Sequence, residues 1–313
     1  MAGTAPSQRQ QAYADETLPG TINATPAFKL VHRAVAMKAA PAPEYGMSLV
    51  SKGALLGRTI LNIPISGSLA DGHMVYGAYD RWLESLLQGT WTADVLIDAK
   101  DQNAFSIEDR FPAGNGGTLQ YERYKGVEAV SGSFKFASGQ PMQFGMSFLG
   151  IGSDDIATTA KAGATYTNPA INDPYGSGAD MTTLTMAGYT LDCFSSFELN
   201  ISFEGRTVQD RILSNTACGI ARGDIRATMK ARMFVEANYA AMYNAARINH
   251  TPFKVTVNLG QTTLQKYRFE MTNTYFDANT PDWTGDSGFI DVMMTATYHP
   301  GTASVVKITR ALV

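Results

Sequence analysis

Regular alternation of apolar and polar residues is the feature that most constrains the fold of this 313-residue chain. A period of two is typical of a strand with one buried face and one solvated face. The alternation recurs in seven rows, whose apolar members are Leu61, Ile63, Ile65 and Leu69; Met142, Phe144, Met146 and Phe148; Phe197, Leu199, Ile201 and Phe203; Ile225, Ala227, Met229, Ala231 and Met233; Val255, Val257 and Leu259; Tyr267, Phe269 and Met271; and Ile290, Val292, Met294, Ala296 and Tyr298. These rows predict a mainly β protein. Pro64 cannot donate a hydrogen bond, so we expect an edge or a bulge there.

Two segments have a helical period instead. Residues 74–88 place apolar side chains on one stripe, and Gly89 follows as the expected left-handed stop. Residues 238–248 begin at Asn238 as a candidate N-cap and end before Pro252. Each helix is too short to be stable alone, so each is expected to lie on a sheet.

The elements around these helices follow one order twice: a strand, a long loop, a strand, a helix and further strands. Identity between the halves is low, and the best local match is residues 119–123 against 264–268. The repeated order indicates a duplicated fold. One large sandwich that contains two helices is the alternative. We expect a first domain at residues 1–150, a linker at 151–182 and a second, similar domain at 183–313.

Three segments lack strong periodicity: residues 39–57, 150–182 and 205–223. Loops of this length are uncommon in compact domains unless they bind a partner or become ordered on assembly. The first and third precede corresponding strands of the two halves, which predicts a duplicated arm. The middle segment is expected to link the halves.

Charge and composition exclude several classes of function. A net charge of -3 and a pI near 5.8 do not provide the basic surface that duplex nucleic acid requires. No apolar run approaches the ~20 residues of a membrane-spanning helix, and residues 1–11 lack the apolar core of a secretory signal. Cys193 and Cys218 lack the close spacing of a zinc site, so we expect two reduced thiols.

No segment predicts catalysis. Residues 285–288 (GDSG) imitate the nucleophile segment of chymotrypsin-like proteases, but Phe289 follows and no histidine has the flanking pattern of that family, so a turn is expected. The histidines lack metal-ligand spacing. Residues 114–117 (GNGG) lack the lysine of a phosphate loop and predict a hairpin tip. We therefore expect no catalytic residue, cofactor or metal. Unpaired sheet edges suit assembly instead.

The first half resembles a known family in the order and spacing of its motifs. The motifs are residues 13–21 (YADETLPGT), 25–28 (TPAF), 67–69 (GSL), 76–80 (YGAYD), 89–91 (GTW), 105–111 (FSIEDRF), 131–134 (SGSF) and 143–150 (QFGMSFLG). Together they resemble the siphophage major tail tube proteins over about residues 13–154. The second half agrees in element order but departs in its letters.

This resemblance implies a β-sandwich or partial barrel with a flanking helix, here duplicated in one chain. It implies a structural virion protein, not an enzyme, that polymerises into stacked rings and forms the conduit for DNA ejection. The implied partners are further copies of the chain, the tape-measure protein, and the tail terminator and tail-tip proteins, while DNA passes without specific binding and no membrane is involved. The implied location is the virion tail, assembled in the bacterial host cytoplasm.

The resemblance also implies an arm that reaches the adjacent ring, at residues 39–57 and by duplication at 205–223. The apolar residues expected on the first arm are Tyr45, Met47, Leu49, Val50, Leu55 and Leu56. With two tube domains per chain, a ring of three chains would present six units, which we prefer to a ring of six chains.

A lumen that passes DNA should avoid cations, because each contact with a phosphate would retard transit. The acidic strand residues Glu108, Glu122, Glu128, Glu198 and Glu204 are the candidates for the lumen wall, and ordinary solvated positions are the alternative for each. The alternative function is a β-sandwich binding module, an adhesin or carbohydrate binder of a tail tip. That function predicts a small oligomer with an aromatic-lined pocket.

Overall fold

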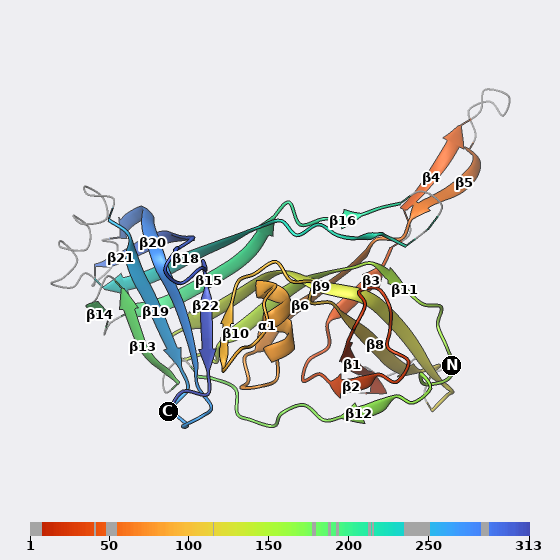
Figure 1. The fold of residues 1–313 in the computed structure, drawn as a ribbon, viewed down its shortest axis with the longest axis horizontal. Coiled ribbons are helices and arrows are strands. Elements are labelled where there is room, and N and C mark those ends of the chain that lie inside the picture. The colour runs from red at the N-terminus through yellow and green to blue at the C-terminus, as the bar shows by residue number, and fades with distance from the viewer. Residues whose placement is uncertain are drawn as a thin grey trace.

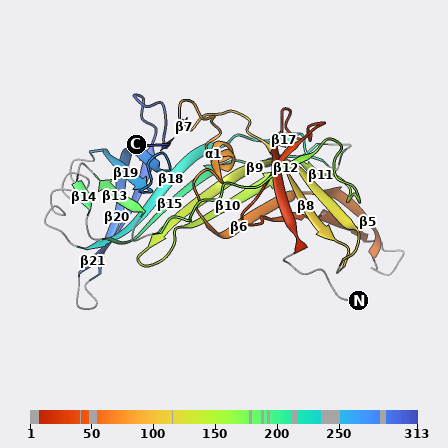
Figure 2. The same cartoon turned by 90° about the horizontal axis from the view of Figure 1, so that it is seen from below.

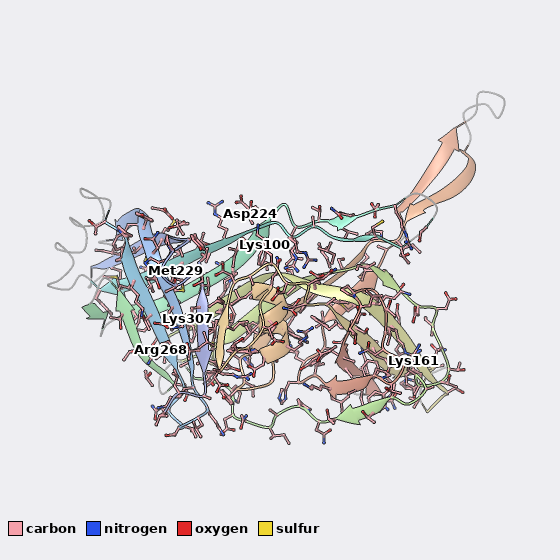
Figure 3. All side chains as sticks on the ribbon, in the orientation of Figure 1. Lys100, Lys161, Asp224, Met229, Arg268 and Lys307 are labelled. Carbon is pink, nitrogen blue, oxygen red and sulfur yellow. The ribbon has the colours of Figure 1, made fainter. Side chains whose placement is uncertain are left out.

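The computed structural model describes residues 8–40, 42–47, 55–114, 116–176, 180–186, 189–191, 194–211, 214, 216–234, 251–282 and 288–313. The described part is mainly β, as predicted, and its body is elongated, with one hairpin projecting from one end (Figure 1). Lys161 lies at that end, and Arg268 lies near the other (Figure 3). The second predicted helix, at 238–248, lies outside the described residues.

Helix α1 (Asp80–Leu87) buries one side, including Trp82 and Leu86, and packs on the sheet as predicted. It begins six residues later than predicted because strand β6 (Ile65–His73) runs to His73 and the chain then turns. Gln88 takes the left-handed conformation expected of Gly89, with φ 51°. Gly89 is required for a different reason, because a Cβ there would lie 2.1 Å from the Ile97 carbonyl oxygen.

The first half forms a ladder that bends along one long strand. Its order is β2–β1–β8–β9–β10–β6–β3, with bounds β1 Gln10–Asp15, β2 Ala27–Leu30, β3 Ala36–Ala39, β8 Phe105–Pro112, β9 Leu119–Ala137 and β10 Gln143–Gly150. The N-terminal part of β9 pairs with β8 and its C-terminal part with β10. Gly126, at φ +60°, lies just before their junction, at the register shift against β8, and a Cβ there would meet the Ile151 side chain at 2.5 Å.

The second half repeats this ladder strand for strand. Its order is β14–β13–β19–β20–β21–β18–β15, with bounds β13 Met181–Met186, β14 Tyr189–Leu191, β15 Phe194–Glu204, β18 Asp224–Phe234, β19 Phe253–Leu259, β20 Tyr267–Asp282 and β21 Phe289–Thr297. The long strand β20 divides its partners as β9 does, pairing with β19 and then with β21. The duplicated order predicted from the sequence is therefore present in the strand pairing.

The remaining strands are short or project from this ladder. They are β4 (Ala42–Met47), β5 (Leu55–Asn62), β7 (Val95–Ile97), β11 (Gly152–Ser153), β12 (Thr165–Thr167), β16 (Val208–Gln209), β17 (Gly219–Ile220) and β22 (Lys307–Arg310). The predicted strand through Pro64 is divided there, since β5 ends at Asn62 and β6 begins at Ile65.

The two halves are joined edge to edge in one sheet. Residues 131–137 of β9 pair antiparallel with residues 196–202 of β15, so the strands of both halves run side by side (Figure 2). A second connection comes from β22, which pairs with β20 on one side and with β7 on the other. Polar contacts complete it: the Tyr267 hydroxyl and Arg310 both donate to the Asp80 carboxylate at the start of α1.

One hydrophobic core runs through both halves, but its composition changes along the way. Around α1 it is aromatic: the Trp82 ring stacks on Phe105, with centroids 6.3 Å apart, and meets Phe148 edge-on at 5.3 Å. In the second half, strands β18 and β21 contribute mainly Ala and Met, namely Ala227, Met229, Ala231, Met233, Met294 and Ala296. Methionine adapts its shape to irregular spaces, whereas stacked aromatic rings do not.

Candidate assembly surfaces

Strands β4 and β5 form a hairpin that pairs only with itself among the described residues and projects away from the body (Figure 1). Of the residues predicted for the arm, Tyr45 and Met47 lie on β4, and Leu55 and Leu56 on β5, with Met47 opposite Leu55. Leu49 and Val50 lie outside the described residues. The predicted arm segment is therefore a two-stranded hairpin where the structure describes it.

The segment 205–223 differs from the expectation of two matching arms. It contains the short pair β16–β17 and packs against the body. Ala217 and Ile220 are buried with Ile151, and the Ala217 N–H donates to the Ile151 carbonyl at 3.0 Å. The second half thus keeps the long segment at the equivalent place in the chain but lays it over the first half (Figure 1).

A buried ion cluster explains this conformation. The fully buried Glu128 carboxylate of β9 accepts hydrogen bonds from the buried Arg206 and, at 2.9 Å, from Arg222. Burial lowers the pKa of Arg206. The Gln88 amide at the end of α1 also donates to the Arg222 carbonyl, at 2.8 Å. A buried carboxylate needs compensating charge, and here both cations, Arg206 and Arg222, come from segment 205–223.

Two of the five predicted lumen residues are inside the molecule, which corrects the prediction for them. Glu128 is enclosed by the cluster just described. Glu108 is buried as well, where Arg123 contacts its carboxylate at 2.6 Å and the Tyr166 hydroxyl donates to it at 2.5 Å. Their place in the strand pattern suggested solvent, but residues 159–166 cover Glu108 and segment 205–223 covers Glu128. Alternation within a strand does not show whether another segment covers its polar side chains.

The other three predicted lumen residues reach the surface to different extents. Glu122 is half-buried on the part of β9 that pairs with β8. Glu198 and Glu204 share the outer face of β15. Glu198 lies 3.3 Å from Lys135 and accepts a hydrogen bond from the Asn200 amide, while Glu204 pairs with Arg226 at 2.6 Å.

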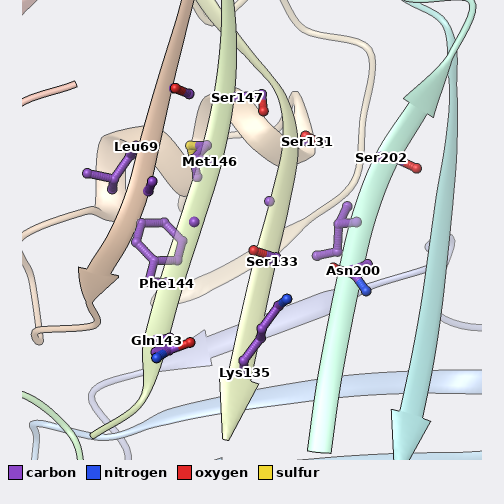
Figure 4. Close-up of a pocket in the computed structure, with 15 residues that line it drawn as sticks. Leu69, Ser131, Ser133, Lys135, Gln143, Phe144, Met146, Ser147, Asn200 and Ser202 are labelled. Carbon is purple, nitrogen blue, oxygen red and sulfur yellow. The ribbon is translucent and has the colours of Figure 1, made fainter. Parts of the chain in front are cut away.

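The face that carries Glu198 and Glu204 consists mainly of short polar side chains, which lie in cross-strand rows (Figure 4). The rows are Ser68, Ser147, Ser131 and Ser202; Gly145, Ser133, Asn200, Thr228 and Thr295; and Gln143, Lys135, Glu198, Lys230 and Met293. Several cations and carboxylates of the face pair with each other, so the wall is mixed in charge rather than acidic. The polar members of each alternating row in the sequence already indicated such a polar face.

Features that would suggest catalysis are weak. Among the described residues, no group of three or more His, Cys, Asp or Glu side chains could hold a metal ion, and no helix of that part is long and apolar enough to cross a membrane. The loop 114–117 joins β8 to β9, as predicted for a hairpin tip. Cys218 is a free, exposed thiol, whereas Cys193 and residues 285–287 lie outside the described residues.

A duplicated β ladder with a projecting hairpin and a broad polar sheet face suits a structural protein that assembles with further copies. The family model of the phage tail tube proteins matches residues 6–286, and the chain belongs to this family. A comparison with curated proteins gave no match. Membership makes the protein a structural component of the virion tail, one that assembles with copies of itself and with other tail proteins.

Proposed function

We propose that this chain polymerises into stacked rings that form the tail tube of a siphophage, the conduit through which DNA reaches the host. The observation that carries the proposal is the edge-to-edge union of two halves with one strand order. Repeating a joint of this kind between chains adds the same rotation at each step, and the chains form a ring where that rotation closes after a whole number of steps. A ring of three chains then presents six units.

The polar rows on the outer sheet face are proposed as the lumen wall. Of the predicted lumen residues, Glu198 and Glu204 belong to this face, and Glu122 stays a separate candidate. Short hydroxyl and amide side chains offer no fixed positive charge to a phosphate. Lys135 and Arg226 pair with carboxylates, and the exposed Lys230 lies directly across the strands from Glu198. DNA would therefore pass along this wall without specific binding, and the tape-measure protein would fill the lumen before ejection.

The hairpin β4–β5 is proposed to reach the adjacent ring. It carries Tyr45, Met47, Leu55 and Leu56, and Leu49 and Val50 lie between its strands in the sequence. Apolar residues on a projecting hairpin are a liability for an isolated chain, and stacking of rings would cover them. The last rings would meet the terminator and tip proteins through the same surfaces, during assembly in the host cytoplasm.

Negative-stain microscopy of the purified chain tests the proposal. The chain should form rings and tubes, and a variant with residues 43–61 replaced by Gly-Ser-Gly should keep its circular dichroism spectrum and its rings but lose long tubes. Replacing the exposed Ile171 by Ser is the control for a general loss of surface apolarity and should leave tube length unchanged. Tubes of normal length without the hairpin would refute its role. A chain that stays monomeric at every concentration would instead favour a binding module of the tail tip.

A further inference from the structure

A surface pocket lies close to the C-terminus, at the end of the body away from the β4–β5 hairpin (Figure 1). Segments that are distant in the sequence form its walls, namely Tyr76 before α1, residues 171–175, Asp180, and the turn 260–265 between β19 and β20. Its volume is about 390 Å³, within the range of about 300–1,000 Å³ that is typical of small-molecule sites. Neither the polar sheet face nor the hairpin includes any of these residues, so the tube function leaves the pocket unexplained.

Hydrogen bonds within the chain fix the walls of the pocket. The Tyr175 hydroxyl donates to the Gln265 carbonyl at 3.0 Å. The Asn172 amide donates to the Tyr76 carbonyl, also at 3.0 Å. Gly260 has φ +90°, and a Cβ there would lie 2.5 Å from the Gln265 carbonyl oxygen, so only glycine allows the turn to close this tightly. A pocket whose walls are already held in place loses little conformational entropy when a ligand binds.

The lining of the pocket is mainly polar, and among the described residues it contains no Lys, Arg or His. Asp173 and Asp180 contribute carboxylates, and Asn172, Gln261 and Gln265 contribute amides. Without a cation the pocket disfavours a phosphate or another anion. The polar groups equally disfavour a lipid or an apolar peptide, because such a ligand would bury them without hydrogen bonds. The lining therefore favours a neutral ligand that is rich in hydroxyl groups.

Two polar side chains of the pocket are available to such a ligand. Asp173 and Gln265 are exposed, and within the described part of the chain neither side chain has a hydrogen-bond partner. A carboxylate accepts hydrogen bonds, whereas an amide both donates and accepts them, so the pair matches hydroxyl groups, which do both. The half-buried Tyr76 and the exposed Ile171 add apolar surface against which C–H groups can pack.

We propose that this pocket binds a neutral pyranose sugar of a glycan. Hydroxyl groups of the sugar pair with Asp173 and Gln265, and the C–H face of its ring lies against Tyr76. The site is independent of the proposed tube function, because it requires neither the hairpin nor the polar sheet face. A tube would carry one such pocket per chain, and many weak sites on one particle hold a polysaccharide far more tightly than a single site does.

Saturation-transfer NMR of the full chain tests the site, with methyl glucoside, methyl galactoside and N-acetylglucosamine as the probes. At least one probe should receive saturation from the protein. Asp173→Ala and Gln265→Ala should each weaken its binding about tenfold, the effect of losing one hydrogen bond of about 1.4 kcal/mol. Glucose 6-phosphate should bind more weakly than methyl glucoside, because the carboxylates of the pocket repel its phosphate.

The matched control is Asp155→Ala, which removes an exposed carboxylate outside the pocket and should leave sugar binding unchanged. Circular dichroism verifies that each variant is folded. Absence of saturation transfer to all the probes would overturn the site, and so would equal binding by the wild-type chain and both pocket variants. Where the wild-type chain forms tubes, the measurement is repeated on them. Binding that the free chain shows and the tubes lose would mean that a neighbouring chain fills the pocket, and would overturn its role as a glycan site.

Discussion

The two halves of the chain share a strand order but use the long segment before β6 and before β18 differently. In the first half this segment includes a hairpin that leaves the body. In the second half it lies over the first half, and its two arginines, Arg206 and Arg222, enclose Glu128 of β9. A duplicated fold can therefore keep its ladder while one copy of a segment is released for contacts between molecules and the other holds the two copies together.

The edges differ in a complementary way. The first half has its β9 edge filled by β15, whereas the second half has the matching part of β20 open among the described residues. Since the same ladder stands behind both edges, the difference lies in which strand pairs with each edge and not in the fold. One chain then resembles a strip with two unlike ends, suited to head-to-tail closure.

Loss of Glu128 should give the largest effect among simple substitutions. Glu128→Ala leaves Arg206 buried without its counter-ion and should reduce the free energy of unfolding by about 3–5 kcal/mol. Because the cluster holds down the second-half segment, hydrogen exchange within residues 205–223 should also become faster. Urea denaturation and hydrogen-exchange mass spectrometry measure the two effects.

The matched control is Glu204→Ala, which removes the carboxylate of an exposed pair with Arg226. Exposed pairs contribute about 0–1 kcal/mol, so stability should hardly change. If the two variants lost similar stability, or if exchange in 205–223 stayed slow without Glu128, the ion cluster would not be what separates the two segments.

The contact between the halves at α1 should give the next largest effect. The buried Tyr267 hydroxyl accepts the Gly77 N–H at 3.0 Å and donates to Asp80, so Tyr267→Phe leaves both groups with one partner fewer. The expected loss is about 1–3 kcal/mol of unfolding free energy in urea. Tyr298→Phe, at a tyrosine that is 57% exposed, should change it by less than about 0.5 kcal/mol. A single unfolding transition that splits in two in Tyr267→Phe would show that this contact couples the halves.

Most of the ladder could be predicted because its information is local. Alternation located the core rows of β10, β15, β18, β19 and β21, and the order of elements indicated the duplication. The boundaries of α1 could not be read in this way, because Met74 and Val75 are buried by packing outside the helix. Apolar side chains in a turn and in a helix satisfy the same pattern.

The assembly surfaces were predictable in part. The length of the segment and the resemblance to the family predict a long arm, but the β-hairpin that it forms and the burial of Glu108 and Glu128 were not predicted. Their partners Arg123, Tyr166 and Arg206 come from β9, β12 and segment 205–223, so burial depended on contacts between different elements. The polar rows were visible as residue types, whereas their alignment required the register.

The two halves should respond to pH in opposite directions through one buried glutamate each. Burial raises the pKa of Glu16 above 4.5, so the folded chain holds this proton longer and loses stability as pH rises through that raised pKa. For Glu270 burial acts in the same sense, but hydrogen bonds from Lys254 and Lys307 prevail and lower the pKa below 4.5. Its contribution is therefore present above pH 4.5 and is lost as pH falls.

Substitution separates the two contributions. Glu16→Gln should make stability fall less as pH rises above 4.5, and Glu270→Gln should make it fall less on acidification below pH 4.5. A difference of one unit between the folded and unfolded pKa corresponds to about 1.4 kcal/mol, which sets the scale. Thermal unfolding across pH 3.5–7 measures both. Equal pH profiles for the two variants would contradict the assignment.

The ion pair across the internal joint should give the smallest effect. Lys135 and Glu198 face each other between β9 and β15 at 3.3 Å, and both are partly exposed, so Glu198→Gln should cost about 0.2–1 kcal/mol in urea and less at high salt. A much larger loss in Glu198→Gln would mean that the joint between the halves depends on charge. A small loss would leave the backbone pairing of β9 with β15 as its basis.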